Sequence, residues 1–432
     1  MKLPQQSRRD FLKTSALGTA LWVSGIESTR AANSPNEKLN IGAIGVGGRG
    51  RADLNAVTTE NIVAICDVDD VRLGEAAKNL SSAKTYNDYR KLLEQDDLDA
   101  VVIGTPDHHH APAAIRALKR GLHVYCEKPL THTVREARVL TETARKMNVA
   151  TQMGTQNHEH PGYLKSIELV KQGAIGPVRE AHVITDRPGR WWDQGQTVPQ
   201  DRPEIPQELH WDLWLGPAAE RPYSPAYVPF AWRGWWDFGC GAIGDMAIHL
   251  MDPLFMALDL GGPVKVTSTG PAVLPASGPT EMITKFEFGA RGDLPPCTVY
   301  WYEGEAKPTG EVAELLPMNG HLLLGDDGKI ACQHSKYPTL IKGDEVRDLT
   351  PMQAVPFSDS QHHQQWITAC KTGSPTGSNF DYAGPFTEVV LLGNVAYRTG
   401  STIHYDPQTM KITNNAAAND LLDKEYRKGW EV

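Results

Sequence analysis

From residue 39 to about residue 156, short apolar runs alternate with longer stretches in which apolar residues recur at helical spacing. The apolar runs predict strands over 39–44, 61–66, 100–104, 123–126 and 150–153. The helical spacing predicts helices over 111–120 and 133–146. Strands that alternate with helices are typical of a parallel sheet covered on both faces. We therefore expect a doubly wound α/β domain over residues 38–156.

Beyond residue 156 the pattern changes to longer strand-like runs separated by turns. These runs predict strands over 178–185, 264–269, 283–288, 297–302 and 321–324. Successive strands without helices between them favour an open, mainly antiparallel sheet, so we expect an α+β domain over residues 157–385. A helical pattern over 386–398 begins a C-terminal segment that runs to residue 432.

Charge and cysteine content exclude several classes of protein. The 432 residues carry a formal net charge of -9, and five Lys/Arg against two Asp/Glu fall within residues 1–32, so the remainder carries about -12. This acidic balance disfavours nucleic acid as a partner. Six cysteines occur without any C-x-x-C pair, which favours neither a zinc site nor a redox motif. Cys66 and Cys126 end predicted core strands, and we expect both to be buried thiols.

The N-terminus reads Ser7-Arg8-Arg9-Asp10-Phe11-Leu12-Lys13, followed by an apolar run over 16–26 and small residues at 31 and 32. This order is typical of a twin-arginine export signal over residues 1–32. It predicts a periplasmic protein that meets the twin-arginine translocase during export. The alternative is a frayed amphipathic N-terminus of a cytosolic enzyme. The apolar run is too short to span a bilayer, so we expect no permanent membrane span, although the signal could be cleaved or kept as an anchor.

A glycine-rich turn follows the first predicted strand and precedes a helix; its residues are Gly45, Gly47, Gly48, Arg49 and Gly50. Glycines in this pattern permit a tight turn, close approach of a pyrophosphate and close packing of helix on sheet. Asp67 stands 20 positions after Gly47, where a carboxylate would accept hydrogen bonds from ribose hydroxyls and repel a 2′-phosphate. The pattern predicts a Rossmann domain that binds NAD rather than NADP. The alternative is a structural turn beside a surface aspartate.

Two further segments end strands at the same edge of the predicted sheet, where open α/β sheets bind ligands. One is 104–110, with the triple histidine, and the other is 127–129. Consecutive histidines rarely converge on one ion, so we predict no metal site. The alternative for 104–110 is a helix-entry loop in which Asp107 caps the helix. From these segments and the next domain we expect further cofactor contacts from Thr105, Pro106, His110, Glu127, Lys128, Gln156 and Arg233.

The second domain contains Asp245-x-x-x-His249-x-x-Asp252. On an α-helix at 100° per residue these three side chains fall within about 60° of one another. Oxidation of an alcohol needs a base for the hydroxyl proton, and we assign that role to His249, tuned near neutrality. Asp245 would orient the imidazole or hold a neighbouring hydroxyl, and Lys128 would stabilise charge on the reacting oxygen. Asp252 would support them; the alternative is a helix cap and a structural histidine.

The glycine turn, Thr105-Pro-Asp-His-His-His110, Glu127-Lys-Pro129 and Asp245-x-x-x-His249 together resemble the glucose–fructose oxidoreductase, inositol dehydrogenase and MocA (Gfo/Idh/MocA) family. The resemblance implies that Lys128, Asp245 and His249 lie at a hydride-transfer centre. It also implies that one face of the second sheet covers the active site and the other builds a homo-oligomer. The C-terminal helix would pack back on the first domain. The family usually has Asn where this chain has Asp107, which leaves His110 in register.

Seven of the 11 tryptophans lie between residues 191 and 236, among Pro, Gly, Arg and Asp. Aromatic faces stack on the C–H faces of sugar rings, so one or two of these side chains could face a substrate; otherwise they fill the domain junction as apolar bulk. Our candidates for the substrate pocket are His158, His160, Tyr163, Arg187, Trp235 and Trp236.

These features predict an NAD-dependent oxidoreductase that acts on a secondary alcohol of a sugar, glycoside or cyclitol. NAD is made inside the cell, so an exported enzyme should hold its cofactor tightly. The close alternative is a glycosidase or lyase that uses NAD catalytically, through transient oxidation at C3 and elimination. A third possibility is a sugar-binding protein without catalysis.

Overall fold

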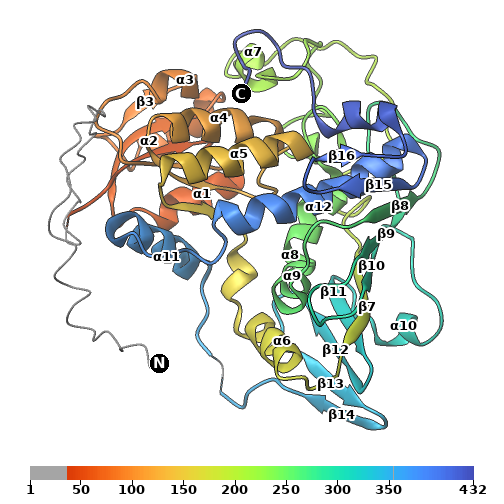
Figure 1. Ribbon diagram of the computed structural model, residues 1–432. Helices are drawn as coiled ribbons and strands as arrows, with labels where there is room; N and C mark the ends of the chain where they lie inside the picture. Colours follow the sequence, from red (N-terminus) through yellow and green to blue (C-terminus); the bar gives the residue numbers. More distant parts are fainter. Residues whose placement is uncertain (1–36, 354) are drawn as a thin grey trace, which may run out of the picture.

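The computed structural model describes residues 37–353 and 355–432 (Figure 1). The predicted export signal over residues 1–32 lies outside the described residues. No helix of the described chain is both long enough and apolar enough to cross a membrane.

The first domain is a six-stranded parallel sheet with the strand order β3-β2-β1-β4-β5-β6, which confirms the predicted Rossmann fold. The strands are β1 (Asn40–Ile44), β2 (Asn61–Cys66), β3 (Lys84–Tyr86), β4 (Ala100–Ile103), β5 (His123–Cys126) and β6 (Thr151–Met153). The central strands are almost entirely buried, as expected for a sheet covered on both faces. The order reverses between β1 and β4, and their carboxyl ends frame a crevice there. Cys66 and Cys126 are buried free thiols, as predicted.

The helices of this domain are α1 (Gly48–Ala56), α2 (Asp70–Ala77), α3 (Tyr89–Leu92), α4 (Asp107–Lys119) and α5 (Val134–Met147). Helix α4 begins at Asp107, four residues before its predicted start. The prediction was wrong because His108, His109 and His110 are buried in the first turn, and their contacts with other segments compensate for their polarity. Helix α5 begins with a capping box between Thr133 and Glu136, close to the predicted start.

The second domain contains a ten-stranded sheet with the order β14-β13-β12-β11-β7-β10-β9-β8-β15-β16. Its pairs are antiparallel except β7 with β10, which confirms the predicted open, mainly antiparallel sheet. The predicted strands are β7 (Val178–Thr185), β8 (Lys265–Thr269), β9 (Met282–Phe288), β10 (Cys297–Glu303) and β11 (Gly320–Gly325). The sequence pattern missed β12 (Gly328–Gln333), β13 (Thr339–Lys342), β14 (Glu345–Asp348), β15 (Ile403–Asp406) and β16 (Lys411–Ile412).

Two helices near the C-terminus connect the domains (Figure 1). Helix α11 (Asp359–Thr372) returns to the first domain, where Trp366 is fully buried. Helix α12 (Phe380–Thr399) begins six residues before its predicted start, because the Asn379 side chain caps it. It packs against α5, where Arg138 Nε lies 2.7 Å from Glu388 Oε1, and against β8.

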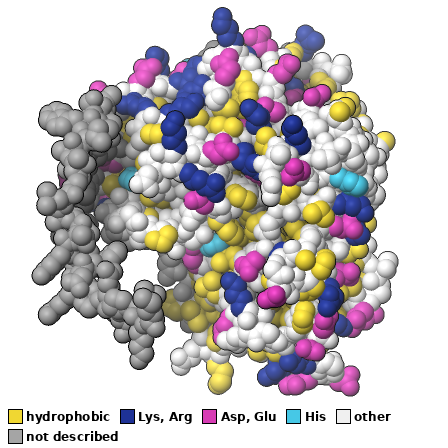
Figure 2. Space-filling view, in the orientation of Figure 1, with side chains coloured by type: hydrophobic (Ala, Val, Ile, Leu, Met, Phe, Trp, Pro, Cys, Tyr) yellow, Lys and Arg dark blue, Asp and Glu magenta, His cyan; other side chains and the backbone are white. Residues whose placement is uncertain are grey.

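The second domain also contains α6 (Pro161–Lys171), α7 (Trp211–Leu215), α8 (Ile248–Leu250), α9 (Asp252–Leu258) and α10 (Gly310–Leu315). On the face in Figure 2, acidic and basic side chains are interspersed.

Candidate active site

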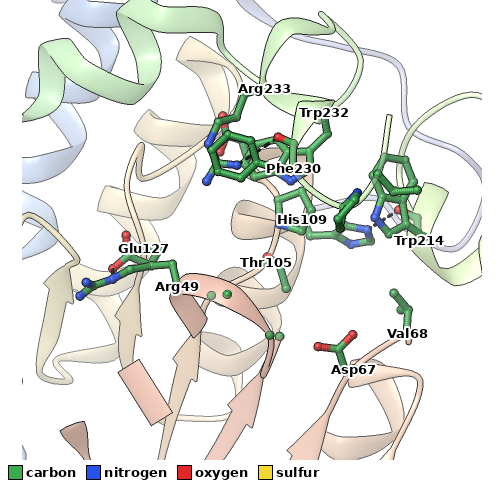
Figure 3. Close-up of a pocket in the computed structure, with 18 of the residues that line it drawn as sticks. Arg49, Asp67, Val68, Thr105, His109, Glu127, Trp214, Phe230, Trp232 and Arg233 are labelled. Carbon is green, nitrogen blue, oxygen red and sulfur yellow. Dashed lines mark hydrogen bonds and ion pairs between the residues drawn. The ribbon is translucent and has the colours of Figure 1, made fainter. Parts of the chain in front are cut away.

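A cavity of about 740 Å³ opens at the carboxyl ends of β1, β2, β4 and β5 and extends to the second domain. Its lining includes most of the predicted cofactor residues: Gly45, Gly47, Gly48, Arg49, Asp67, Thr105, Pro106, Glu127, Lys128, Gln156 and Arg233. Figure 3 shows Asp67 and Val68 at one side of this cavity and Arg233 with Phe230 and Trp232 at another. Strands from one domain and loops from the other therefore share one continuous pocket.

The glycine turn has the geometry that its sequence predicts. Gly45 has φ +79°, and a Cβ there would lie 2.7 Å from the carbonyl oxygen of Gly104. A Cβ on Gly50 would lie 2.0 Å from the carbonyl oxygen of Gly45, so only glycine allows α1 to approach β1 this closely. Gly50 packs behind the turn rather than lining the cavity. Gly47 and Gly48 face the cavity at the start of α1, where backbone N–H groups favour an anion.

Asp67 follows β2 and is held by two backbone donors. Its Oδ2 accepts a hydrogen bond from Val46 N at 2.9 Å, and its Oδ1 accepts one from Asp69 N at 3.0 Å. Burial raises the pKa of Asp67. Arg72, which the sequence reasoning missed, also lines this end of the cavity, and a Cβ on Gly47 would lie 2.6 Å from its Nη1. A carboxylate and a guanidinium therefore stand together where the adenosine ribose of a dinucleotide would lie.

The Thr105 and Glu127 loops complete this half of the cavity. The hydroxyl oxygen of Thr105 is buried and has no hydrogen-bond partner among the described residues, as expected of a group that meets a polar ligand. Glu127 accepts hydrogen bonds at Oε1 from Gln156 Nε2 at 2.6 Å and from Arg49 Nε at 3.1 Å. A dinucleotide fits this half of the cavity, which offers the unpaired Thr105 hydroxyl, the glycine turn and the fixed Asp67 carboxylate.

His110, predicted as a cofactor contact, lies outside the cavity lining. Its Nδ1 is 2.7 Å from the carbonyl oxygen of Pro129, and its Nε2 is 2.9 Å from that of Thr105. The residue is 1% exposed. It ties together the two loops that carry Thr105 and Lys128, so it positions the site instead of touching the cofactor.

Lys128 and Asp245 form a close ion pair between the two domains. Lys128 Nζ lies 2.6 Å from Asp245 Oδ1 and 2.8 Å from the Asp245 carbonyl oxygen. Arg233 Nε lies 3.6 Å from Oδ1, and Arg187 Nη1 lies 3.9 Å from Oδ2. Burial alone would raise the pKa of Asp245, but these three cations lower it far below its usual value. The carboxylate is therefore ionised, and one of the three N–H groups of Lys128 remains for a substrate oxygen.

The sequence analysis placed Asp245 and His249 on a single α-helix, but the structure divides this segment. Residues Ile243–Ala247 form a π-helical turn, α8 covers only Ile248–Leu250, and α9 starts at Asp252. Pro253 at the first turn of α9 has no N–H to continue the preceding helix, so a new helix begins there. The predicted single helix is therefore wrong, but Asp245 and His249 still face the same cavity, whereas Asp252 does not line it. π-Helical turns occur often at functional sites.

His249 lines the cavity together with Lys128 and Asp245. Its Nδ1 is buried and has no hydrogen-bond partner among the described residues, so the predicted Asp245–imidazole contact through this nitrogen is not formed. Asp245 is instead bound to Lys128. Burial and the charge of Lys128 lower the pKa of His249 well below its usual value. The imidazole is therefore neutral and able to accept a proton, although it is not tuned near neutrality as predicted.

Asp252 supports a different histidine. Asp252 Oδ2 lies 2.9 Å from His158 Nδ1, and Tyr382 donates a hydrogen bond to Asp252 Oδ1 at 2.5 Å. The Asp252 carboxylate raises the pKa of His158, although burial alone would lower it. His158 does not line the cavity, so the structure does not support its predicted contact with substrate; Asp252 also lies outside the lining, and its predicted supporting role stays a prediction.

Of the remaining substrate candidates, Arg187 lines the cavity. Its guanidinium lies 3.8 Å from the ring centroid of Trp191, which is 54% exposed. The other candidates do not line the cavity, because they are held elsewhere. Tyr163 is buried, with its hydroxyl oxygen 2.9 Å from His334 Nδ1, and His160 caps α6 through Gly162 N.

Trp235 and Trp236 also lie outside the cavity. Their indole nitrogens donate to the carbonyl oxygens of Ala226 at 3.0 Å and Leu274 at 3.2 Å. Both rings are buried, so these two residues are structural. The tryptophans that line the cavity are Trp191, Trp214 and Trp232.

Sequence reasoning missed His334, which lies on the turn after β12 and lines the cavity. Its ring centroid is 5.4 Å from that of His249. No motif surrounds this residue, and its strand was itself not predicted. Only the folded sheet brings it to the site.

Five of the 11 tryptophans belong to a segment that we name the cover segment, residues 206–238. Its aromatic side chains form a small core that also packs against Val68. Asp70 N donates to the carbonyl oxygen of Glu208 at 2.9 Å, and His210 N donates to that of Val68 at 2.9 Å. Residues of this segment, including Leu209, Tyr223 and Phe230, line the cavity. The cover segment therefore closes over the end of the cavity that contains Asp67.

Two of the three consecutive histidines, His108 and His109, anchor this cover segment. His108 Nε2 lies 3.1 Å from the carbonyl oxygen of Trp214, and His109 Nε2 lies 2.8 Å from the same oxygen. His109 also lines the cavity beside Trp214 (Figure 3). Among the described residues, no group of three or more His, Cys, Asp or Glu side chains is arranged to hold a metal ion.

The fold and the cavity define a two-domain protein with a Rossmann domain whose cavity suits a dinucleotide. Residues 39–155 match the Gfo/Idh/MocA oxidoreductase family model for its NAD-binding Rossmann fold, and residues 167–281 match that family's C-terminal α/β domain. The two matches together cover more than half of the chain, and the chain belongs to this family. The prediction of NAD as the cofactor is thereby confirmed.

Several curated relatives match part of this chain. Inositol 2-dehydrogenase of Salmonella typhimurium is 31% identical over 178 residues, which are 40% of this chain and 50% of the relative. A glycosyl hydrolase family 109 protein of Shewanella pealeana is 30% identical over 218 residues, 43% of this chain and 47% of the relative. Levoglucosan dehydrogenase of Pseudarthrobacter phenanthrenivorans is 25% identical over 228 residues, 50% of each chain. The chain thus spans about half the length of the curated relatives it matches.

Solved structures support the fold over most of the chain. WlbA dehydrogenase of Bordetella pertussis, in complex with NADH and UDP-GlcNAcA, superposes with a TM-score of 0.63 at 18% identity, covering 86% of this chain and 99% of the other. Levoglucosan dehydrogenase with NADH and levoglucosan superposes with a TM-score of 0.61 at 18% identity, covering 85% and 99%.

Replacement of Asp67 by alanine should weaken NAD binding by roughly 10-fold or more, because a charged acceptor for the ribose hydroxyls is lost. The preference for NAD over NADP should also narrow, since the 2′-phosphate is no longer repelled and Arg72 remains nearby. Calorimetric titration of protein freed of nucleotide would measure both dissociation constants. Asp201→Ala, at an exposed position, is the matched control. Tighter binding of NADP than NAD by the unmodified protein would contradict the assignment.

Proposed function

We propose that this protein is an NAD-dependent oxidoreductase that oxidises or reduces a secondary alcohol of a sugar, glycoside or cyclitol. The observation that carries this proposal is the Lys128–Asp245 pair, 2.6 Å apart, beside His249 in the cavity that the glycine turn also lines. An ammonium, an ionised carboxylate and a neutral imidazole at the end of a dinucleotide site are the groups that alcohol oxidation requires.

The roles of the three residues follow from their charge states. NAD, when bound, supplies the acceptor or donor of hydride. Lys128 donates its remaining N–H to the reacting oxygen and stabilises negative charge there. His249, neutral in the folded protein, accepts the hydroxyl proton. Asp245 fixes the ammonium through its carboxylate and its carbonyl oxygen, so the donor is oriented before the substrate arrives.

Names of relatives support a polyhydroxylated substrate. The matched relatives include inositol and levoglucosan dehydrogenases, and similar structures contain NADH with levoglucosan or L-sorbose. The exposed ring of Trp191 at the cavity, backed by Arg187, is a suitable platform for the C–H face of a sugar. We therefore take a free sugar, glycoside or cyclitol as the substrate class.

Replacement of His249 by alanine should lower turnover by roughly 10²- to 10⁴-fold, the usual loss when a general base is removed. Folding and NAD content should be unchanged. For the unmodified protein, the lowered pKa of His249 places the loss of base below pH 6.5. The value of kcat/KM should therefore stay constant as the pH falls through 6.5 and decline only at more acidic pH. Near-normal turnover of the variant, or half-loss of kcat/KM at or above pH 6.5, would reject His249 as the base.

We further propose that NAD is held tightly and that the protein is exported through the twin-arginine pathway to the periplasm. The support for export is the Ser7–Lys13 motif, and the support for retention is the cover segment. Two backbone hydrogen bonds join the cover segment to residues that follow β2. On the outside, Arg427 donates from Nε to the carbonyl oxygen of Gly216 at 2.9 Å and from Nη1 to Asp212 Oδ1 at 2.6 Å. By resemblance to the family, we also propose a homo-oligomer.

If the cover segment retains NAD, the purified protein should contain nicotinamide, released only on denaturation. Arg427→Ala should then speed dissociation of NAD by roughly 10-fold, because it loosens the cover segment without touching the cavity. The release rate can be followed by gel filtration and assay of the bound nicotinamide at successive times. Arg179→Ala, which removes an exposed pair with Asp326, is the matched control. Empty protein that needs added NAD for every turnover would contradict retention and weaken the case for export.

One experiment separates oxidoreductase from glycosidase chemistry, a choice that the glycosyl hydrolase family 109 relatives keep open. The purified protein, without added NAD, is incubated with aryl glycosides and with free sugars and cyclitols. A change in nicotinamide absorbance without release of the aglycone is the result we expect. Release of the aglycone at constant nicotinamide absorbance would identify the NAD-dependent glycosidase instead. If no compound gives either signal, both the oxidoreductase and the glycosidase activity are contradicted.

A further inference from the structure

One cation of the cavity has no hydrogen-bond partner and no role in the proposed oxidation. Arg187 lies on the loop after β7 and lines the cavity, with a side chain that is 21% exposed. Its guanidinium makes no hydrogen bond to any residue that the structure describes. Nη1 lies 3.9 Å from Asp245 Oδ2, which is beyond hydrogen-bond distance. The N–H donors of this guanidinium are therefore available to a ligand.

An aromatic ring holds the guanidinium in place. Its Cζ atom lies over the ring of Trp191, 3.8 Å from the ring centroid. A guanidinium over a ring face does not use its N–H groups as hydrogen-bond donors to that ring. Arg187 therefore offers a planar set of donors whose position is already fixed, and such a set suits a planar anion.

The charges close to Arg187 do not balance it. Asp245 Oδ1 already lies 2.6 Å from Lys128 Nζ and 3.6 Å from Arg233 Nε, so one carboxylate serves three cations. Burial lowers the pKa of Arg187, and the attraction of Asp245 does not make up for this effect. A cation has a lowered pKa when its surroundings compensate its charge less well than water does. Arg187 therefore lacks negative charge in its surroundings.

The other acidic side chains near this end of the cavity do not supply that charge. Asp186 is paired with Arg190 and lies outside the cavity lining. Asp107 lines the cavity, where the charges of Lys128 and Arg233 attract its carboxylate. The three cations around the reacting centre therefore face two carboxyl groups. This end of the cavity has an excess of at least one positive charge.

We infer that Arg187 binds the carboxylate of a sugar acid, so that the substrate is a uronic acid or a glycoside of one. This inference rests on the proposed function and deepens it, because it names the substrate class of the same site. A carboxylate carries a single negative charge, and its two oxygens match two parallel N–H groups of a guanidinium. Lys128 and Arg187 lie beside the two oxygens of one carboxylate, that of Asp245, so one monosaccharide can reach both cations. The reacting oxygen lies at Lys128 and the substrate carboxylate at Arg187.

The test uses the unmodified protein saturated with NAD, and methyl glycosides of the gluco, galacto and manno series. Each series contains the uronate, its neutral uronamide and the hexoside 6-phosphate, and both kcat/KM and calorimetric Kd are measured. In at least one series the uronate should bind roughly 10- to 100-fold more tightly than the uronamide, which has a similar shape without the charge. Absence of this preference in every series, or tighter binding of the 6-phosphate than of the uronate, would overturn the inference.

Variants test whether Arg187 is the source of the preference. Arg187→Ala should abolish it, mainly through KM and Kd, because the carboxylate is bound equally in the ground state and the transition state. Arg187→Lys keeps the charge without the planar fork of donors and should recover part of the preference. Arg190→Ala removes a cation that is 69% exposed on the same loop and lies outside the cavity lining, so it should keep the full preference. A preference that is unchanged in Arg187→Ala would also overturn the inference.

The comparison of uronate with uronamide needs no variant, so it decides the question even if Arg187→Ala does not fold. A preference in Kd that depends on Arg187, without any change in nicotinamide absorbance, would support the inference while contradicting the proposed oxidation. Oxidation of neutral sugars without any preference for a uronate would support the oxidation and overturn the inference. The two failures are therefore distinguishable.

Discussion

The contact between Lys128 and Asp245 is the interaction on which the site depends. Lys128 follows β5 of the Rossmann domain, and Asp245 lies in the π-helical turn of the second domain, so their two hydrogen bonds join the domains at the reacting centre. Their side chains are 14% and 10% exposed. Removing one partner of such a pair leaves a buried charge, at a cost of about 3–5 kcal/mol. The same contact therefore orients the donor and fixes how the two domains meet.

The cover segment changes the interpretation of the tryptophan-rich sequence. Trp211, Trp214 and Trp235 belong to an apolar core that packs against Val68, next to Asp67 at one end of the cavity. The histidines that resemble a metal motif hold this core through the carbonyl oxygen of Trp214. Sequence composition alone associates tryptophan with sugar, but burial and indole hydrogen bonds assign most of these rings to enclosure of the cofactor site.

Local patterns were sufficient to predict five of the six Rossmann strands, because each of the five is a short apolar run bounded by turns, as in Asn61–Cys66 and His123–Cys126. They missed β3, whose residues are mostly exposed. They failed where tertiary contacts decide the structure. Strand β14 has four exposed residues and no apolar alternation, and it exists because it pairs with β13. The π-helical turn was unpredictable from spacing, since its sequence is compatible with an ordinary helix. The sequence analysis also missed His334, because only the pairing of β11 with β12 brings this residue to the cavity.

The site also behaves as one electrostatic unit. Besides burial, the positive charge of Lys128 contributes to lowering the pKa of both His249 and His334, so one ammonium helps keep two imidazoles neutral. Asp245 balances that charge, and Arg187 and Arg233 in turn keep Asp245 ionised. A cationic group beside neutral acceptors suits an alcohol oxygen that loses its proton and gains negative charge.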